Sequence, residues 1–289
     1  MKYDTVVDLL YIVKNSSLKQ GRWSLFICYL RLAFNYHLGL KSKDKEGYEH
    51  CLGYKIRFAN YKTFFKLFRD IFVRNTYYFY TQKIEPTIID AGANIGMVTL
   101  YYKVLYPKAK ILAFEPSPET FEILKDNVEN NNLNDITIFN TAISDNNSST
   151  MEFFHHGSVQ GNTGSSVIKD IVLSKSKKIG RIQVKNSKLS RYITQPVDML
   201  KLDIEGMESE VIHDLITSNK VDLVLESILE FHYNKKYDHN KLHSLLTELS
   251  SCGFDYFIYR VEHDPSSYWF KNKNHYHFMV LAYRTRKKE

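Results

Sequence analysis

The sequence predicts an α/β fold with a mostly parallel sheet of seven strands, preceded by an N-terminal helical extension. Two observations carry this prediction. From Pro86 onward, short apolar runs of strand length alternate with segments of helical periodicity, which is typical of βα units. In addition, hydrophobic residues make up 44% of the 289 residues, which is enough to bury a sizeable core and excludes wholesale disorder.

The N-terminal part, residues 1–80, is predicted to be the mostly helical extension, and residues 81–289 the main domain. Within the extension, the stretch 62–80 places Phe64, Phe68 and Phe72 at helical spacing. This pattern indicates an aromatic stripe that packs into a core.

A second apolar segment of the extension, residues 23–40, is interrupted by Arg31, Asn35 and His37 and is too polar to span a membrane. Its apolar positions permit an amphipathic helix, which we expect to pack against the rest of the chain. A helix lying on a membrane surface is the open alternative. We therefore expect a soluble, cytoplasmic protein, with peripheral contact at the inner face of the membrane as the alternative. The oligomeric state is not determined by the sequence.

Seven strands are predicted in the main domain, with helices after the first, second, fourth and fifth. The last two strands lie close together in sequence, which predicts an antiparallel hairpin at the end of the sheet. The expected strands are residues 87–90, 111–115, 136–141, 199–203, 222–226, 255–259 and 277–283. Between the third and fourth strands lies an insertion, residues 151–196, rich in glycine, serine and lysine. We expect it to form a lid that binds the acceptor, with a plain surface loop as the alternative.

The cysteines and the net charge narrow the class of protein. Cys28, Cys51 and Cys252 form no Cys-x-x-Cys pair and leave an odd thiol in any pairing. We therefore expect neither a disulfide framework nor a structural zinc site, and a reducing compartment. The net charge is +7, but the basic residues are spread among acids. A nucleic-acid partner is not expected, because no basic stripe with interleaved aromatics is present.

The clearest motif is Asp90-Ala-Gly92-Ala93-Asn94-Ile-Gly96, which ends a predicted buried strand and opens a helix. Glycines there allow a tight turn and a close approach of the backbone to a ligand. The spacing departs from the GxGxxG pattern of dinucleotide-binding loops. An acid two residues before the first glycine would repel a pyrophosphate but suits the zwitterionic methionine portion of S-adenosylmethionine.

The ends of the next two strands carry the second and third motifs. Glu115 ends the second strand about 25 residues after the first motif, where an acid can accept both hydroxyls of a ribose. Pro116 then terminates the strand. After the third strand, Ser144 could bond the amino group of an adenine, with Ala142 against the ring and Asp145 beside it.

The fourth motif, Lys201-Leu-Asp203-Ile-Glu205-Gly206-Met-Glu208, again turns from a strand into a helix. Carboxyl-terminal strand ends line the ligand crevice of open parallel sheets. Several acids there are costly unless they meet cations, donors or a proton to abstract. Capping of the helix explains one of them, Glu205 or Glu208, but not the cluster.

These four motifs, in this order, resemble the FkbM family of class I S-adenosylmethionine-dependent methyltransferases, over about residues 55–260. The resemblance implies a seven-stranded Rossmann-like sheet and methyl transfer to a hydroxyl oxygen of a sugar, glycan or polyketide-like metabolite. It also implies that the methionine portion of the cofactor lies by the first motif, the ribose by the second and the adenine by the third. The cofactor-binding residues expected on this basis are Asp90, Gly92, Ala93, Asn94, Gly96, Glu115, Pro116, Ala142, Ser144, Asp145 and Asp203.

The candidate catalytic residues are Asp203, Glu205, Glu226 and His232. Asp203 is favoured as the general base because it sits at a strand end. Glu226 is expected to end the fifth strand, with His232 beyond it on the same edge, where an imidazole titrates near neutrality. The three carboxylates could alternatively hold a divalent ion that orients two sugar oxygens, but a metal-free site is favoured.

Three other readings of the motifs stay open. A nucleic-acid methyltransferase would use the same cofactor and fold. A catalytically silent binding protein could keep the fold without turnover. An NAD-dependent oxidoreductase is disfavoured by the missing GxGxxG pattern.

Overall fold

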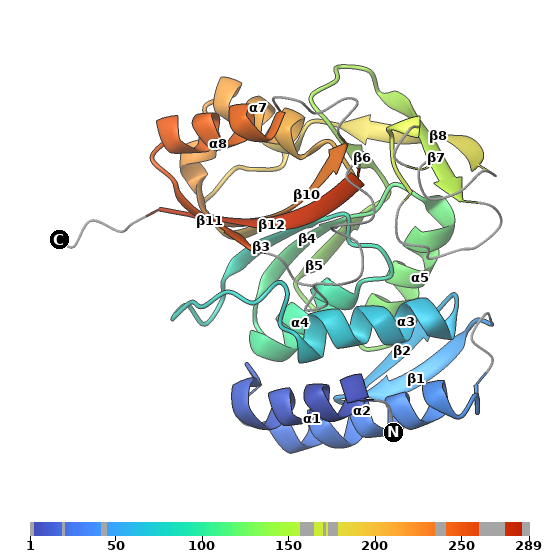
Figure 1. The fold of residues 1–289 in the computed structure, drawn as a ribbon. Helices are drawn as coiled ribbons and strands as arrows, with labels where there is room; N and C mark the ends of the chain where they lie inside the picture. The colour runs from blue at the N-terminus through green and yellow to red at the C-terminus, as the bar shows by residue number, and fades with distance from the viewer. Residues whose placement is uncertain are drawn as a thin grey trace.

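The computed structural model describes residues 3–18, 21–41, 45–156, 165–169, 172, 179–234, 241–259 and 275–284. Its centre is a seven-stranded sheet in the order β11-β12-β10-β9-β3-β4-β5 (Figure 1). Five strands run parallel to one another: β3 (Thr87–Ala91), β4 (Lys110–Phe114), β5 (Ile136–Phe139), β9 (Val197–Leu202) and β10 (Val224–Asn234). The last strand, β12 (His275–Tyr283), is antiparallel to both of its neighbours, β10 and β11 (Asp255–Tyr259).

This topology confirms the predicted fold class. Counted in chain order, the seven strands lie as 3-2-1-4-5-7-6, which is the Rossmann order with the final strand inserted antiparallel between the fifth and the sixth. The predicted antiparallel hairpin at the end of the sheet is present. The fifth strand, β10, is much longer than the predicted residues 222–226, and this difference changes the site described below.

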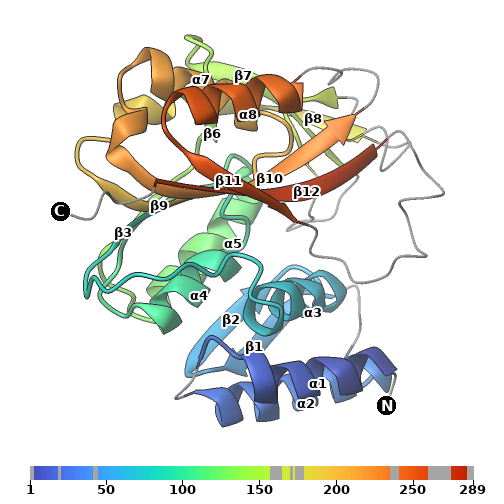
Figure 2. The same ribbon diagram turned by 60° about the vertical axis from the view of Figure 1, so that its left-hand side comes forward.

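Helices cover both faces of the sheet. α4 (Met97–Leu105) and α5 (Pro118–Glu129) lie on one face, and α7 (Glu208–Thr217) and α8 (Lys241–Ser251) lie on the other (Figures 1 and 2). Both faces of the sheet are apolar because successive side chains of a central strand point into the cores on opposite sides, as two neighbouring residues of β3 show. Ile88 packs in the core shared with α4, while Ile89 packs in the core under α7 and α8. Burial on both faces is the usual situation of a central parallel strand.

The N-terminal part packs beyond α4 and α5 as an outer layer. Its helices share a hydrophobic core with α4, so that the aromatic stripe at Phe64, Phe68 and Phe72 is buried as expected. An antiparallel hairpin at 47–58 was not predicted and adds two short strands to this part, whose other elements are helical. The elements are α1 (Tyr3–Asn15), α2 (Arg22–His37), β1 (Gly47–Cys51), β2 (Tyr54–Phe58), α3 (Tyr61–Phe68) and a π-helical turn η1 (Arg69–Val73).

A disulfide joins this layer internally. Cys28 of α2 and Cys51 of β1 are paired, whereas Cys252 is a free thiol. No disulfide was expected, so this pair is a correction, and the cysteines no longer support a reducing compartment. The pairing was hidden because the two residues meet only when the hairpin packs on α2. Among the described residues, none of the helices is long and apolar enough to cross a bilayer.

The insertion contributes a small second sheet, in the order β6-β8-β7. Its glycines at 157, 161 and 164, on which the predicted lid depended, lie outside the described residues. The strands are β6 (Ala142–Ile143), β7 (Thr150–His156) and β8 (Ile179–Ser187), and short 3-10 turns, η2 (Leu189–Arg191) and η3 (Val221–Leu223), precede β9 and β10.

Candidate active site

The carboxyl ends of β3, β4, β9 and β10 meet at one edge of the sheet, and the first, second and fourth predicted motifs lie there. The strand order reverses between β3 and β9, which are hydrogen-bonded neighbours. Such a reversal separates the loops that follow the two strands and makes this position the usual ligand site of open α/β sheets.

Gly92 allows the loops after β3 and β9 to approach each other. It adopts a left-handed φ of 81°, and a Cβ atom there would lie 1.8 Å from the backbone oxygen of Asp203. The backbone N–H groups of Gly92 and Ala93 both donate to the carbonyl of Phe114, at 3.0 and 2.8 Å. A glycine is therefore required, and the loop that it forms is fixed to the end of β4.

Asp90 and Lys201 form a buried ion pair beneath this loop. The Lys201 ammonium lies 3.2 Å from Asp90 Oδ1, and the Thr99 hydroxyl donates to the other carboxylate oxygen at 2.7 Å. Lys201 also donates to the carbonyl of Gly92 at 2.6 Å. Asp90 is completely buried, so the structure does not support its predicted direct contact with the ligand. Its side chain instead holds Lys201, which sequence analysis did not assign to the site, under the glycine turn.

Glu115 lies at the end of β4 as predicted and is suited to ribose binding. Its two carboxylate oxygens accept backbone N–H groups from Asn94, at 3.0 Å, and Ser117, at 2.9 Å. Each oxygen retains acceptor capacity for a ribose hydroxyl. Burial raises the pKa of Glu115 to about 7, although the two N–H donors lower it. Two further hydroxyl donors would stabilise the charged form, so the residue fits the ribose of S-adenosylmethionine.

The third motif is only partly placed at this edge. The Ser144 hydroxyl is buried and donates to Asn186 of β8 at 2.9 Å, so the predicted bond to an adenine is not supported. Ala142 is buried in β6, and the role of Asp145 stays a prediction. Asn140, within the same motif, was missed: its amide donates to the carbonyls of Glu115 and Pro116 and joins the ends of β4 and β5.

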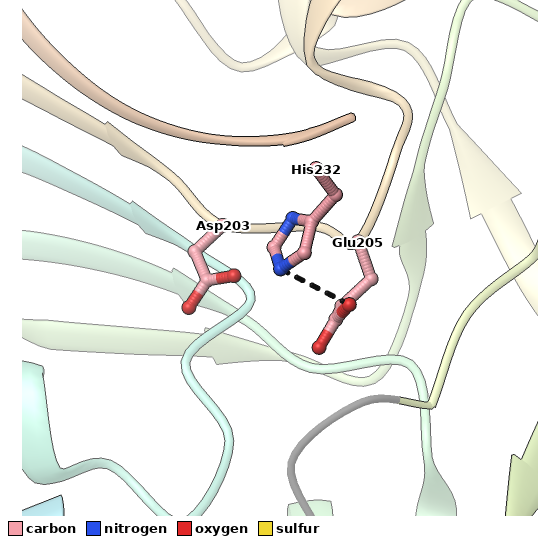
Figure 3. A group of neighbouring side chains, drawn as sticks. All are labelled: Asp203, Glu205 and His232. Carbon is pink, nitrogen blue, oxygen red and sulfur yellow. Dashed lines mark ion pairs between the residues drawn. The ribbon is translucent and has the colours of Figure 1, made fainter. Parts of the chain in front are cut away.

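Asp203, Glu205 and His232 converge at the ends of β9 and β10 (Figure 3). The imidazole of His232 lies between the two carboxylates, and its Nε2 atom is 3.2 Å from Glu205 Oε2. One possible ligand atom from each of the three residues lies within 4.8 Å of the others. Three of the four predicted catalytic residues are therefore brought together.

The loop that carries Glu205 has an unusual backbone. Glu205 adopts a φ of 56°, a left-handed conformation that is uncommon outside glycine, and Gly206 follows with a φ of 110°. The buried Glu208 carboxylate holds this loop by accepting the N–H groups of Ile204 and Gly206, each at 3.1 Å. Of the two acids considered as caps, Glu208 therefore has the structural role, and Glu205 projects into the site.

Glu226, the fourth predicted catalytic residue, is not at this edge, and its assignment was wrong. β10 begins at Val224, and Glu226 pairs with Met199 in the interior of β9. Glu230 lies four residues further along the strand, which corresponds to about 13 Å. The strand continues past the end of β9, so Glu230 and His232 occupy the edge that Glu226 was expected to occupy.

Tyr77 was missed as a site residue, and Glu230 was expected on the same edge as His232 but was not chosen as catalytic. The Tyr77 hydroxyl is 3.1 Å from Asp203 Oδ2 and 2.8 Å from Glu230 Oε2. A phenol has one proton and can satisfy only one carboxylate at a time. Alternation along β10 would have placed Glu230 beside His232 had the strand been extended. No local signal marks Tyr77, which lies 126 residues from Asp203.

The excess of carboxylates in the site shifts the pKa values upward. Burial and then Glu230 raise the pKa of Asp203 to about 7, against the opposing effect of Lys201. Burial alone would lower the pKa of His232, but Glu205, with Glu208 and Glu230, raises it to about 10. Near neutral pH the site therefore holds an imidazolium beside Glu205 and a carboxyl group at Asp203 that readily exchanges its proton.

A Rossmann-like sheet with a glycine turn, a strand-end acid suited to a ribose and an acid cluster at its switch point is typical of S-adenosylmethionine-dependent methyltransferase domains. Within that class, residues 90–256 match the methyltransferase FkbM domain, and the chain belongs to this family. The predicted family is thereby confirmed.

The chain is similar to several named methyltransferases. The chain is 28% identical over 174 residues to methyltransferase sdnD of Sordaria araneosa, covering 50% of this chain and 66% of the relative. It is 30% identical over 162 residues to methyltransferase 1 of Beauveria bassiana, covering 51% and 65%. The match thus spans slightly less than two thirds of the length of these relatives. Among solved structures, methyltransferase FkbM from Methylobacillus flagellatus aligns with a TM-score of 0.49 at 11% identity, over 97% of this chain and 59% of that chain.

Proposed function

We propose that the protein transfers the methyl group of S-adenosylmethionine to a hydroxyl oxygen of a sugar, glycan or related natural product. The observation that carries the proposal is the placement of Asp203 and His232 beside the glycine turn, on the edge where Glu115 can bind the ribose. Two relatives with O-methyltransferase names support the choice of oxygen as acceptor atom. These are 2-O-methyltransferase NoeI of Sinorhizobium fredii and 31-O-demethyl-FK506 methyltransferase FkbM of Streptomyces tacrolimicus.

The cofactor, when bound, supplies a methyl group that is already activated on a sulfonium. The chain must then position the acceptor in line and remove its proton. Holding two reactants in a productive geometry can supply roughly 7–11 kcal/mol of barrier lowering. In this proposal Glu115 and the turn at Gly92 fix the cofactor, so that the cluster at Asp203 faces the reactive end.

Asp203 is the proposed general base. Its side chain is 27% exposed, more than Glu205 or His232, and is therefore the group that an acceptor can reach. A pKa of about 7 matches the operating pH of a general base. In this proposal Asp203 would accept the proton of the acceptor hydroxyl, whose place on the oxygen the methyl group of the bound cofactor would take. The His232 imidazolium, held by Glu205, would supply a positive charge beside the carboxylates of this site.

Calorimetric titration with S-adenosylmethionine and with NAD tests the cofactor part of this proposal. We expect micromolar binding of S-adenosylmethionine, equivalent to about −8 kcal/mol, and no binding of NAD. Glu115→Ala removes two charge-assisted hydrogen bonds of roughly 1.5–3 kcal/mol each and should weaken binding by at least about 100-fold. Unchanged affinity in this variant would place the ribose elsewhere. Asp203→Asn, which keeps the shape of the side chain, should retain cofactor binding but lose methyl transfer to a glycan acceptor.

A further inference from the structure

Helix α2 has two apolar faces. One face, which includes Leu25, Tyr29 and Leu32, is buried in the N-terminal core. The opposite face carries an exposed row of large apolar side chains, which we call the apolar stripe. The stripe consists of Trp23, Ile27, Leu30, Phe34 and, directly after the helix, Leu38.

The geometry of the apolar stripe is that of a single helix face. Its members follow one another at intervals of four, three, four and four residues, which brings them to one side of a helix. Their side chains are between 38% and 66% exposed. An outer helix of a water-facing layer ordinarily turns charged and polar residues to this side. The core of the protein already uses the other face, so packing among the residues that the structure describes does not explain the stripe.

The segment that carries the stripe is rich in positive charge. Residues 1–41 contain six Lys or Arg and two Asp, and six minus two leaves +4, out of +7 for the whole chain. Among the described residues, Arg31 and Lys41 share one buried carboxylate, Glu49, so this group keeps a net positive charge. One of the two acids, Asp8, is completely buried and paired with Arg69 and Arg74. Helices α1 and α2 also form the layer farthest from α7 and α8 (Figures 1 and 2).

We propose that the apolar stripe docks on an anionic membrane surface, with α2 lying in the plane of the interface. Apolar side chains on one face and a cationic surrounding are the two features that bind a helix to such a surface. Trp23 suits the boundary between headgroups and acyl chains, because its ring is apolar and its indole N–H is polar. A second copy of the chain could cover the same stripe but would oppose one cationic layer with another. The proposal goes beyond the proposed methyl transfer and does not depend on it.

The test is flotation of the full chain with phosphatidylcholine vesicles, with and without phosphatidylglycerol. We expect binding to the anionic vesicles that weakens with salt. The variant Ile27→Ser/Phe34→Ser should lower the partition coefficient by about tenfold or more, since both side chains leave the apolar phase. The matched control is Ile84→Ser/Phe257→Ser, which replaces the same residue types at 74% and 62% exposure, compared with 65% and 58% in the stripe. The control should bind within about twofold of the wild type.

A second measurement does not rely on the stability of a variant. Trp23 in the wild-type protein should be quenched by brominated lipids in anionic vesicles, and the quenching should be lost in Trp23→Phe. Failure of the wild type to bind anionic vesicles, or equal binding by the stripe variant, would overturn the proposal. So would sedimentation equilibrium that shows a wild-type dimer, dissociated by Ile27→Ser/Phe34→Ser, without vesicle binding, because the stripe would then be a self-association surface.

Discussion

Replacing Gly92 by alanine tests the central claim that the site depends on the close approach of two loops. The chain offers a matched control in Gly53, in the turn of the β1–β2 hairpin. Both glycines are left-handed, with φ of 81° at Gly92 and 87° at Gly53. A Cβ at Gly53 would meet nothing within 4 Å, whereas a Cβ at Gly92 would lie 1.8 Å from the Asp203 carbonyl oxygen.

The expected loss of stability follows from these two environments. Holding an alanine in the left-handed region costs about 1–2 kcal/mol, and this is the whole cost at Gly53. At Gly92 the new methyl group must also displace backbone, and overpacking of this kind adds about 1–3 kcal/mol or more. The left-handed cost is common to both variants, so we expect Gly92→Ala to lower the free energy of unfolding by at least about 1 kcal/mol more than Gly53→Ala does. The gain from restricting the unfolded chain is the same for both variants and cancels.

Urea denaturation of the two variants measures this difference, and titration with S-adenosylmethionine measures its consequence for the site. Gly92→Ala should lose cofactor binding even where it remains folded, because the shifted loop moves Asp203 and the Lys201 contact at Gly92. Gly53→Ala should bind like the wild type. Equal stability losses in the two variants, with cofactor binding retained in both, would refute the close approach of the loops as the reason for the glycine.

Three further predictions concern the charges of the site. Tyr77→Phe removes a hydrogen-bond donor to the Asp203 carboxylate and should raise the pKa of Asp203. The acidic limb of the pH profile of kcat/KM should therefore move up by about one pH unit. An unmoved limb would show that Asp203 is not the general base. His232 has its pKa raised to about 10 in the folded state, so its charge stabilises the fold fully below about pH 6.5 and this contribution is lost as the pH rises toward 10. The difference in unfolding free energy between the wild type and His232→Gln, measured in urea, should therefore shrink over that range, and a constant difference would contradict the ion pair. A chelator should leave methyl transfer unchanged, because a divalent ion bound here would have to displace the proton of His232 beside Glu205. Loss of activity in chelator that magnesium restores would instead show that the site binds a metal ion.

The sequence by itself determined the features that depend on neighbouring residues. Alternating apolar runs of strand length and of helix length were enough to predict the fold class. The spacing of apolar residues in a short segment shows whether it buries them as a strand or as a helix. Residues at the ends of these runs could be placed on one edge of the sheet, because parallel strands all end there. Gly92, Glu115 and Asp203 were found in this way.

The tertiary structure decided which side chains meet across the chain. The boundary of β10 could not be read from the sequence, since its last residues pair with β12 rather than with β9, and so Glu226 was chosen in place of Glu230. Tyr77 reaches Asp203 only when the N-terminal part packs against the sheet, and Cys28 reaches Cys51 only when the β1–β2 hairpin packs on α2. These contacts are set by topology and by the burial of opposite charges, such as Lys201 with Asp90, which no local pattern encodes.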